Sequence, residues 1–338
     1  MNVLHVINGV PISGGMNQIY NYIKNSQHSH MCIVNLRDGY SYIEKLAKAN
    51  IECILSDLEY SNLVDVVKKH KIDIVHKQTG GGDCPSYVQK LYDHGIPLAE
   101  TLHCPRKSAI PEGYVKKIHA HFSYTASLNP GRNVVVIPFP IDLAIGETKK
   151  ALWPDKKMVV GRLARYEPSK MQDFIIKVAH YIRGDYPQHA VGMIFKIGGF
   201  ANTVYEKAYL ANLKRSSIAG YIEVVDFVSE EDKESFIASY DLYLNPTQNE
   251  ANYSFFEPMT KGIPVISNPT EMTKDLFVCK WADLTERAFS EAIIEYYIDK
   301  EKHQRDSTRS IDMFKKLGHD IETHTQKMDK FYEDAIGV

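Results

Sequence analysis

Short apolar runs alternate with amphipathic stretches along the first 140 residues, and this alternation predicts the fold. The runs that we expect to be strands are Val3–Ile7, Met31–Leu36, Ile51–Leu55, Ile72–His76, Pro97–Leu102 and Val134–Ile137. Helices are expected between them at Asn17–Lys24, Tyr42–Ala49, Leu63–His70 and Ser86–His94. Strands that are apolar throughout, with helices between them, are typical of a parallel sheet covered on both faces.

The same pattern starts again after a polar stretch that runs to Asp155, which we interpret as a linker. The second set of expected strands is Met158–Val160, Gly192–Ile197, Ile222–Val225, Leu242–Leu244 and Pro264–Ser267. Helices are expected at Lys170–Arg183, Tyr205–Ser216, Glu230–Ser239 and Phe255–Lys261, followed by a mostly helical region from Arg287 onward. The pattern therefore predicts two doubly wound α/β domains, residues 1–150 and 151–316. In such folds ligands bind outside the carboxyl ends of the strands, and a cleft is expected between two such domains.

Composition narrows the class of protein. The chain has 338 residues, of which 44% are hydrophobic and 24% charged, so disordered and fibrous classes are excluded. No apolar run approaches the ~20 residues of a membrane-spanning helix, and the N-terminus lacks the basic region of an export signal. The five cysteines are scattered and include no C-x-x-C pair. We therefore expect a cytoplasmic protein from a reducing compartment.

Charge is divided unevenly between the two halves. Residues 1–150 carry a formal charge of +3 and nine of the 14 histidines, whereas the remainder carries −5. This imbalance is too small to indicate nucleic-acid binding by itself. The lysines at 68, 69, 71, 116 and 117 could form a basic face for a membrane surface or for an anionic acceptor, either DNA or a lipid-linked glycan. A solvated helix face is the interpretation that the pattern favours.

A glycine pair follows the first expected strand. Gly14 and Gly15 precede the first helix, where small residues allow close approach of a ligand and helix N–H groups can bind an anion. The segment does not match G-x-G-x-x-G, so a dinucleotide cofactor is not indicated. A simple turn is the alternative.

Two stretches of the second half carry charged residues near strand ends. Arg162 follows an apolar strand and Lys170 precedes a helix, so both could stabilise the charge that develops on a departing phosphate. Glu257 lies one turn inside a later helix, where it could accept hydrogen bonds from the hydroxyls of a ribose. Acids also occur in first turns because the helix dipole favours them.

Six stretches together resemble the retaining glycosyltransferases of family 4. They are Gly14-Gly15, Asp73-Ile74-Val75-His76, Thr101-Leu102-His103, the segment from Val136 to Asp142, Gly161-Arg162-Leu163 with Lys170, and Glu257–Ile266, which is similar to the E-A-M-A-x-G-x-P-V-I signature. The resemblance extends over nearly the whole chain. It implies the GT-B fold of two facing Rossmann-like domains, with residues 317–338 packing back on the N-terminal domain. It also implies a metal-independent enzyme that transfers a sugar from a nucleotide-diphosphate sugar to an acceptor hydroxyl with retention of configuration.

The resemblance also implies roles for individual residues. Arg162 and Lys170 would bind the donor diphosphate, Glu257 would hold the ribose, and His103 would lie near the transferred sugar and the acceptor. The other donor-binding candidates are Gly14, Gly15, Asn249, Glu250, Tyr253, Ser254 and Phe255. His76 and Gly81 are candidates for binding the acceptor, and no metal or further cofactor is implied. A UDP-sugar is the first expectation for the donor and a GDP-sugar the second.

Three departures from the family pattern keep alternatives open. Asn249 occupies the position of the family's first acidic residue, with Glu250 one place later. Met171 replaces a glycine after Lys170, and Asn252 replaces a loop glycine, although asparagine tolerates positive φ. A non-catalytic protein that binds a sugar nucleotide or a partner subunit therefore remains an alternative, as does a GT-B sugar-nucleotide epimerase.

Overall fold

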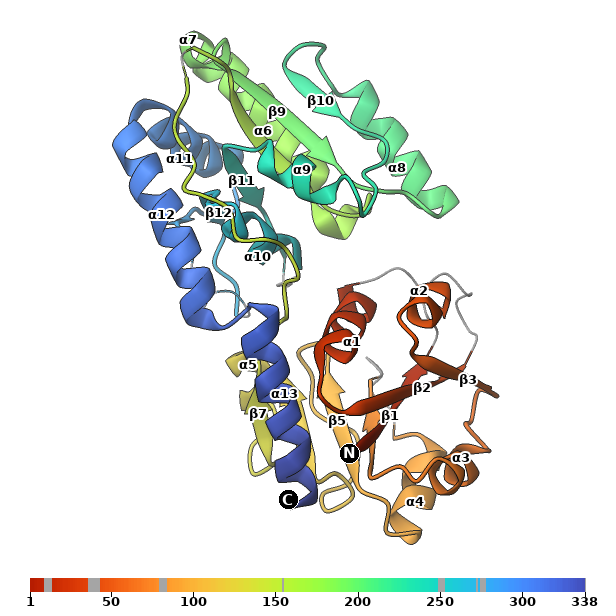
Figure 1. The fold of residues 1–338 in the computed structure, drawn as a ribbon. Coiled ribbons are helices and arrows are strands. Elements are labelled where there is room, and N and C mark those ends of the chain that lie inside the picture. Colours follow the sequence, from red (N-terminus) through yellow and green to blue (C-terminus); the bar gives the residue numbers. More distant parts are fainter. Residues whose placement is uncertain are drawn as a thin grey trace. The chain divides into compact units, whose positions relative to one another are not determined.

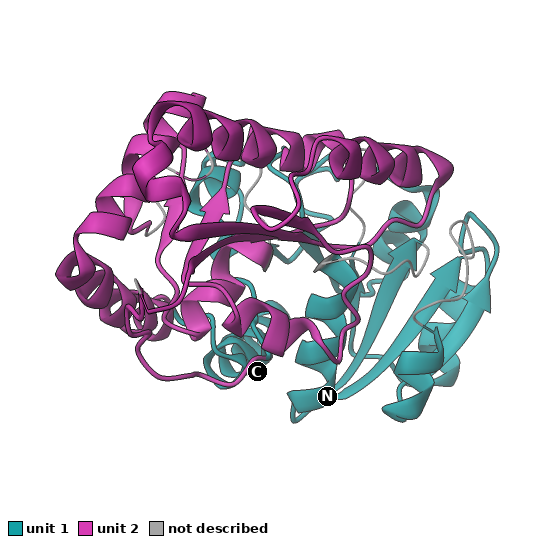
Figure 2. Ribbon diagram, turned by 90° about the horizontal axis from the view of Figure 1, so that it is seen from above, with its two compact units in different colours: residues 1–142, 318–338 teal, residues 143–317 magenta. Residues whose placement is uncertain are grey.

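The chain folds into two compact units, each built on its own parallel sheet (Figure 2). The computed structural model describes residues 1–8, 14–35, 43–78, 84–153, 155–248, 253–271, 273 and 278–337. Unit 1 consists of residues 1–142 and 318–338, and unit 2 of residues 143–317. The expected boundary at residue 150 lies within unit 2, a few residues after the division between the units.

Unit 1 is a seven-stranded parallel sheet with the order β3-β2-β1-β4-β5-β6-β7. Its strands are β1 (Asn2–Asn8), β2 (Ser29–Asn35), β3 (Glu52–Ser56), β4 (Ile74–Lys77), β5 (Leu98–Leu102), β6 (Lys117–Ala120) and β7 (Val134–Val136). Its helices are α1 (Gly14–Asn25), α2 (Ile43–Lys48), α3 (Leu63–Lys69), α4 (Ser86–Asp93), α5 (Ser123–Ser127) and α13 (Ile321–Ile336). The C-terminal α13 lies beside α1 (Figure 1).

Unit 2 is a six-stranded parallel sheet with the order β10-β9-β8-β11-β12-β13. The strands are β8 (Met158–Leu163), β9 (Met193–Gly198), β10 (Ile222–Val224), β11 (Leu242–Asn245), β12 (Val265–Ser267) and β13 (Lys280–Trp281). The helical elements are the short 3-10 turn η1 (Pro168–Lys170), α6 (Gln172–Asp185), α7 (Pro187–Ala190), α8 (Val204–Arg215), α9 (Lys233–Ala238), α10 (Tyr253–Thr260), α11 (Glu286–Ile298) and α12 (Lys300–Leu317).

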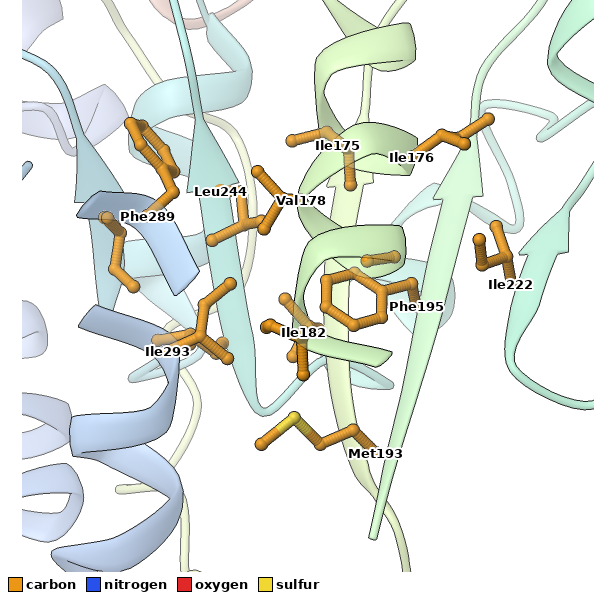
Figure 3. Packing of buried hydrophobic residues seen from close by; sticks show 14 of the residues in the cluster. Ile175, Ile176, Val178, Ile182, Met193, Phe195, Ile222, Leu244, Phe289 and Ile293 are labelled. Carbon is orange, nitrogen blue, oxygen red and sulfur yellow. The ribbon is translucent and has the colours of Figure 1, made fainter. Parts of the chain in front are cut away.

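Buried apolar residues fill the space between each sheet and its helices. In unit 2, Figure 3 shows Val178 and Ile182 of α6 turned toward the strand residues Phe195 and Leu244, with Phe289 of α11 alongside. In unit 1, one core lies under α1 and α13, and a second lies under α3 and α4. The sheets are therefore covered on both faces, as the continuous apolar strands of the sequence predict.

The prediction of two doubly wound α/β domains is confirmed. One strand of unit 1, β6, was not anticipated. Strand β6 has the sequence Lys-Ile-His-Ala, which lacks the apolar run that identifies the other strands. Its polar members are buried because partners from distant segments satisfy them: Lys117 pairs with Asp334 at 2.6 Å, and His119 bonds Thr101 and the carbonyl of Ile137.

Candidate functional site

The strand order of unit 2 makes the ends of β8 and β11 a candidate ligand-binding position. These two strands are neighbours. Strands β9 and β10 extend the sheet beyond β8, and strands β12 and β13 extend it in the opposite direction beyond β11. Ligands of open α/β sheets bind at such a point, outside the carboxyl ends of the strands. Arg162 and Asn245 lie at these strand ends, and Lys170 ends the turn η1, whose carbonyl at Lys170 is hydrogen-bonded to Arg162.

Arg162 has no exposed surface and joins three segments of unit 2. Its Nη1 donates to the side-chain oxygen of Asn245 at 2.6 Å and to the carbonyl of Leu244 at 3.1 Å. Its Nε donates to the carbonyl of Lys170 at 3.2 Å. The side chain thus brings a full positive charge to the strand ends while fixing β8, β11 and η1 together. Direct contact with a phosphate would require the guanidinium to become exposed.

The glycine before Arg162 is explained by the ring of Tyr240. A Cβ atom on Gly161 would overlap three atoms of that ring, which is fully buried. Burial raises the pKa of the Tyr240 phenol well above its ordinary value. The G-R-L segment therefore has a packing reason: glycine admits the aromatic ring beneath the strand that carries Arg162.

Lys170 ends the turn η1 directly before α6. Its ammonium lies 3.7 Å from the Glu167 carboxylate, and its side chain is mostly buried. The next residue, Met171, has φ of 55° and ψ of 35°, the left-handed conformation. This is a conformation that glycine adopts readily and that costs other residues about 1–2 kcal/mol. Met171 therefore keeps the backbone geometry of a glycine position.

Glu257 lies in the middle of α10 and forms an ion pair with Lys233, the first residue of α9. Only 4% of Glu257 is exposed. Burial lowers the pKa of Lys233, but the carboxylates of Glu257 and Glu230 outweigh it and raise the pKa above its ordinary value. Lys233 is therefore charged at neutral pH.

The other donor-binding candidates of unit 2 have different environments. Phe255 has a fully buried side chain packed edge-on against Phe256, so only its backbone could contact a ligand. Ser254 is half-buried and hydrogen-bonds Tyr243. Tyr253 begins α10, but its side chain lies outside the described residues, as do Asn249 and Glu250 entirely.

Unit 1 has a comparable position at the ends of β1 and β4, where its strand order also diverges. Gly14 and Gly15 are the first two residues of α1, whose opening N–H groups have no acceptor within the helix. The acceptor candidate Gly81 lies outside the described residues.

His76 lies inside unit 1, with no exposed surface. Its Nε2 is 2.7 Å from the hydroxyl of Thr101, and its Nδ1 contacts the hydroxyl of Tyr332 and the amide nitrogen of Gln78. Both ring nitrogens are thus engaged within the unit. As the side chain stands, it positions its neighbours and does not reach a ligand itself.

His103 follows β5 and is only partly exposed. Its Nε2 lies 3.0 Å from the side-chain oxygen of Gln78. Burial lowers the pKa of His103 to about 3, and the charges of protonated His119 and of Lys77 act in the same direction. The ring is therefore neutral at physiological pH, with one nitrogen directed at Gln78.

Sequence reasoning missed several polar residues at these strand ends. Gln78 directly follows β4 and His121 directly follows β6, while Gln18 lies in the second turn of α1. In unit 2, Asn245 ends β11 and Lys233 pairs with Glu257. The signal for Gln78 and Asn245 was available, because each is a polar residue at the end of an apolar run. His121 follows no apolar run, and only the recognition of β6 places it at the sheet edge.

Three further expectations concern metals, membranes and anionic partners. Within the described parts of the chain, no three His, Cys, Asp or Glu side chains are grouped as a metal site would require. None of the helices there has the length and apolar character to cross a bilayer. The suggested basic face lacks Lys117, whose ammonium is buried against Asp334 and the ring of Phe331.

Sequence comparisons give no relatives for this chain. No family model matches it, and no curated protein matches it. Inference about its class therefore depends on the fold.

Solved structures, by contrast, match the chain over almost its entire length. Anabaena HepE in complex with UDP superposes with a TM-score of 0.78 at 15% identity, covering 98% of this chain and 100% of that one. A glycosyltransferase from Rickettsia africae gives a TM-score of 0.72 at 13% identity, covering 99% and 98%. The trehalose-6-phosphate synthase OtsA gives 0.70 at 10% identity, covering 98% and 99%. At these identities the likeness shows the fold alone: the chain has the GT-B glycosyltransferase fold.

Proposed function

We propose that this protein is a retaining, metal-independent glycosyltransferase of family 4 that uses a nucleotide-diphosphate sugar, with a UDP-sugar as the first candidate. The observation that carries the proposal is the group of charged side chains at the ends of β8 and β11. Arg162 and Lys170 bring two cations to the position where an α/β sheet binds ligands, and Glu257 provides a carboxylate on a neighbouring helix. Structures with this fold that hold UDP support the choice of nucleotide.

The chemistry assigned to unit 2 is stabilisation of the leaving group. The bond between the anomeric carbon and the donor phosphate oxygen breaks, and the acceptor oxygen forms a new bond on the same face of the sugar. The proton of the acceptor hydroxyl passes to the departing phosphate oxygen. The positive charges of Arg162 and Lys170 favour this step because negative charge accumulates on the diphosphate as the bond breaks.

The role assigned to unit 1 is recognition of the acceptor and of the transferred sugar. Gly14 and Gly15 offer the N-terminal amides of α1 to an anionic group. His103 is neutral and partly exposed at the carboxyl edge of the sheet, so it can form a hydrogen bond with a sugar hydroxyl.

Nucleotide binding tests the donor site directly. We would measure thermal unfolding with UDP, GDP, ADP and dTDP, each at a range of concentrations. A ligand at 100 times its Kd stabilises the folded state by about 2.7 kcal/mol, which corresponds to roughly 5–10 °C for a unit of this size. UDP is expected to give the largest shift.

Two variants make the test specific. Glu257→Gln keeps the volume of the side chain but removes the charge, and it is expected to lose most of the UDP-dependent shift relative to its own melting temperature. Glu291→Gln is the matched control, because Glu291 is about half-exposed on α11 and its ion pair among the described residues is with Arg287. Failure of every nucleotide to shift the wild-type melt would refute the donor site.

A non-catalytic sugar-nucleotide-binding protein is the second candidate. It is favoured because charged groups of the candidate site are already buried or paired within unit 2. Arg162 is fully buried, and Glu257 already has a cationic partner. This candidate predicts nucleotide binding without consumption of any UDP-sugar. Release of UDP from UDP-glucose or another UDP-sugar, in the presence of a panel of sugar acceptors, would exclude it.

A further inference from the structure

Two cysteines lie side by side on the last two strands at one edge of the unit 1 sheet. Cys32 is in the middle of β2, Cys53 is near the start of β3, and the two are register partners in this parallel pair. Register partners of adjacent parallel strands direct their side chains to the same face of the sheet. Cys32 accordingly belongs to the core under α1 and α13, and Cys53 packs against that core. The fold thus places two of the five thiols of the chain against each other.

The spacing of these strands suits a disulfide bond. Neighbouring strands of a sheet are about 4.7–4.9 Å apart, which lies within the range of roughly 4.4–6.8 Å that separates the Cα atoms of bonded cysteines. Strand β3 is at the edge of the sheet and pairs with β2 alone within the described part of the chain, so it can shift slightly as the sulfur atoms approach. Both cysteines are free thiols. They can therefore be joined without separation of the two strands.

The two thiols differ in exposure and in acidity. Cys32 has no exposed surface, whereas Cys53 is partly exposed. A hydrogen bond with Cys32 lowers the pKa of Cys53, and it outweighs the opposite effects of burial and of the Glu52 carboxylate. The same hydrogen bond, together with burial, raises the pKa of Cys32 well above its ordinary value. Cys53 is therefore the thiol that more readily becomes a thiolate, while Cys32 keeps its proton.

The other three cysteines have different surroundings. Cys84 and Cys104 are both exposed, and burial of its sulfur raises the pKa of Cys84. Cys279 lies 3.1 Å from the hydroxyl of Ser310, and burial raises the pKa of this thiol to about 11. Exposure alone would make Cys84 more reactive than Cys53, whereas acidity favours Cys53. Comparison of these two thiols therefore separates the effects of exposure and of the local environment.

We propose that Cys53 and Cys32 form an oxidation site, at which a peroxide converts the two thiols into a reversible disulfide between β2 and β3. Redox-sensing cysteines are solvent-accessible, lose their proton readily and lie next to a second thiol that resolves the first oxidation product. Cys53 matches the sensing thiol and Cys32 the resolving one. Structural zinc requires four ligands, and within the described residues no third His, Cys, Asp or Glu joins the pair to hold a metal.

The oxidation takes place in two steps. The Cys53 thiolate attacks one oxygen of hydrogen peroxide and the O–O bond breaks, which leaves a sulfenic acid on Cys53 and a hydroxide ion that takes up the proton Cys53 had lost. The Cys32 sulfur then bonds to the Cys53 sulfur, the S–O bond breaks, and the departing hydroxide leaves as water with the proton of Cys32. The two thiols lose two electrons and two protons in total, and one peroxide becomes two waters. A dithiol such as dithiothreitol restores both thiols by thiol–disulfide exchange.

Alkylation of the reduced full chain tests the role of Cys53. The protein is treated with a limiting amount of iodoacetamide near neutral pH, and the modified cysteines are identified by peptide mass spectrometry. Cys53 should react about fivefold faster than Cys84 or more, although Cys84 is the more exposed thiol. Cys32→Ala should remove this advantage, because the Cys53 thiolate loses its hydrogen bond. A Cys53 that reacts more slowly than Cys84 in the wild type would overturn the proposal.

Peptide mapping after oxidation tests the disulfide itself. The full chain is treated with a small excess of hydrogen peroxide, its remaining thiols are alkylated, and it is digested without a reductant. We expect a linked pair of peptides that contains Cys32 and Cys53, lighter by two hydrogen atoms than the separate peptides and released by dithiothreitol. Cys32→Ser should halt the reaction at the sulfenic acid, so that dimedone labels Cys53 in this variant and labels it weakly in the wild type.

A surface thiol provides the control for this experiment. Cys104→Ser removes an exposed cysteine of the same unit and should leave the linkage between Cys32 and Cys53 unchanged. Disulfides between two chains through Cys84, or irreversible oxidation of Cys53 without a bond to Cys32, would overturn the proposal. The mapping is done on the wild type, so it stays decisive even if the Cys32 variants fold poorly. It requires no nucleotide and is independent of the proposed function.

Discussion

Lowering the pH from 8 to 5 should destabilise unit 1 selectively. Eight of its histidines have a pKa that burial lowers. In six of them the pKa falls to about 2 (His30), about 3 (His5, His103 and His324) or about 4 (His119 and His319). The other two are His76 and His121. These rings are neutral in the folded state at pH 5, whereas in the unfolded state they bind protons below their ordinary value of 6.5. Stability is therefore complete above pH 6.5 and is lost as the pH falls below it.

The magnitude follows from the difference in proton binding. At pH 5, each histidine that is neutral in the folded state and protonated in the unfolded state lowers the free energy of unfolding by about 2 kcal/mol, because the pH lies 1.5 units below its unfolded pKa. Neighbouring rings do not contribute additively, since one protonation loosens the whole cluster. Two independent histidines already lower the free energy of unfolding by about 4 kcal/mol, which is a large share of the roughly 5–15 kcal/mol that stabilises a typical domain.

The placement of the tryptophans allows the two units to be followed separately. Both tryptophans, Trp153 and Trp281, belong to unit 2, whereas far-ultraviolet circular dichroism reports both units. Urea unfolding at pH 8, 7, 6 and 5 should show a circular-dichroism transition that moves to lower urea while the tryptophan transition moves much less. His324→Gln should flatten this dependence by up to about 1.4 kcal/mol per pH unit, and His94→Gln, at an exposed position, should not. A free energy at pH 5 within about 1 kcal/mol of that at pH 8 would refute the reasoning.

Substitutions at four positions of unit 2 test its strand ends. Gly161→Ala should destabilise the unit by about 1–3 kcal/mol, measured by urea unfolding, because the added methyl overlaps the ring beneath it. Met171→Gly should be more stable than Met171→Ala by about 1 kcal/mol in the same assay, the reverse of the order expected if φ there were negative. Lys170→Ala should reduce sugar transfer by roughly 10²–10³ with an unchanged melting temperature; a loss under tenfold would contradict its assignment. Arg162→Ala should lower the free energy of unfolding by about 3–5 kcal/mol and should also reduce sugar transfer, because it takes a buried charged donor away from its hydrogen-bond acceptors.

The architecture could be predicted from the sequence because its strands are continuous apolar runs. Val3–Ile7 can be recognised as a strand from that pattern alone, since both faces of the strand are buried. Strand β6 could not be found in this way. Lys117 and His119 are buried only because Asp334, Thr101 and the Ile137 carbonyl satisfy them, and those partners come from distant segments.

The candidate site could be predicted only in its location. Arg162 and Glu257 were expected as ligand-binding residues because of their positions after strands and in helices. Their burial depends on Asn245 and Lys233, and neither pairing leaves a local signal in the sequence. Met171 shows the converse. It departs from the family pattern in residue type, yet its backbone has the left-handed conformation that glycine adopts readily.

The discontinuity of unit 1 has a consequence for the order in which the protein folds during synthesis. Helix α13 supplies Met328, Phe331 and Tyr332 to the core under α1, but 175 residues of unit 2 are translated before it. At about 5–20 residues per second, the first 142 residues wait roughly 10–35 s for the helix that completes their core. Unit 2 is contiguous and can complete its core first. The nascent N-terminal segment is thus the part of this protein that depends most on chaperones, and truncation before α13 would leave its apolar face uncovered.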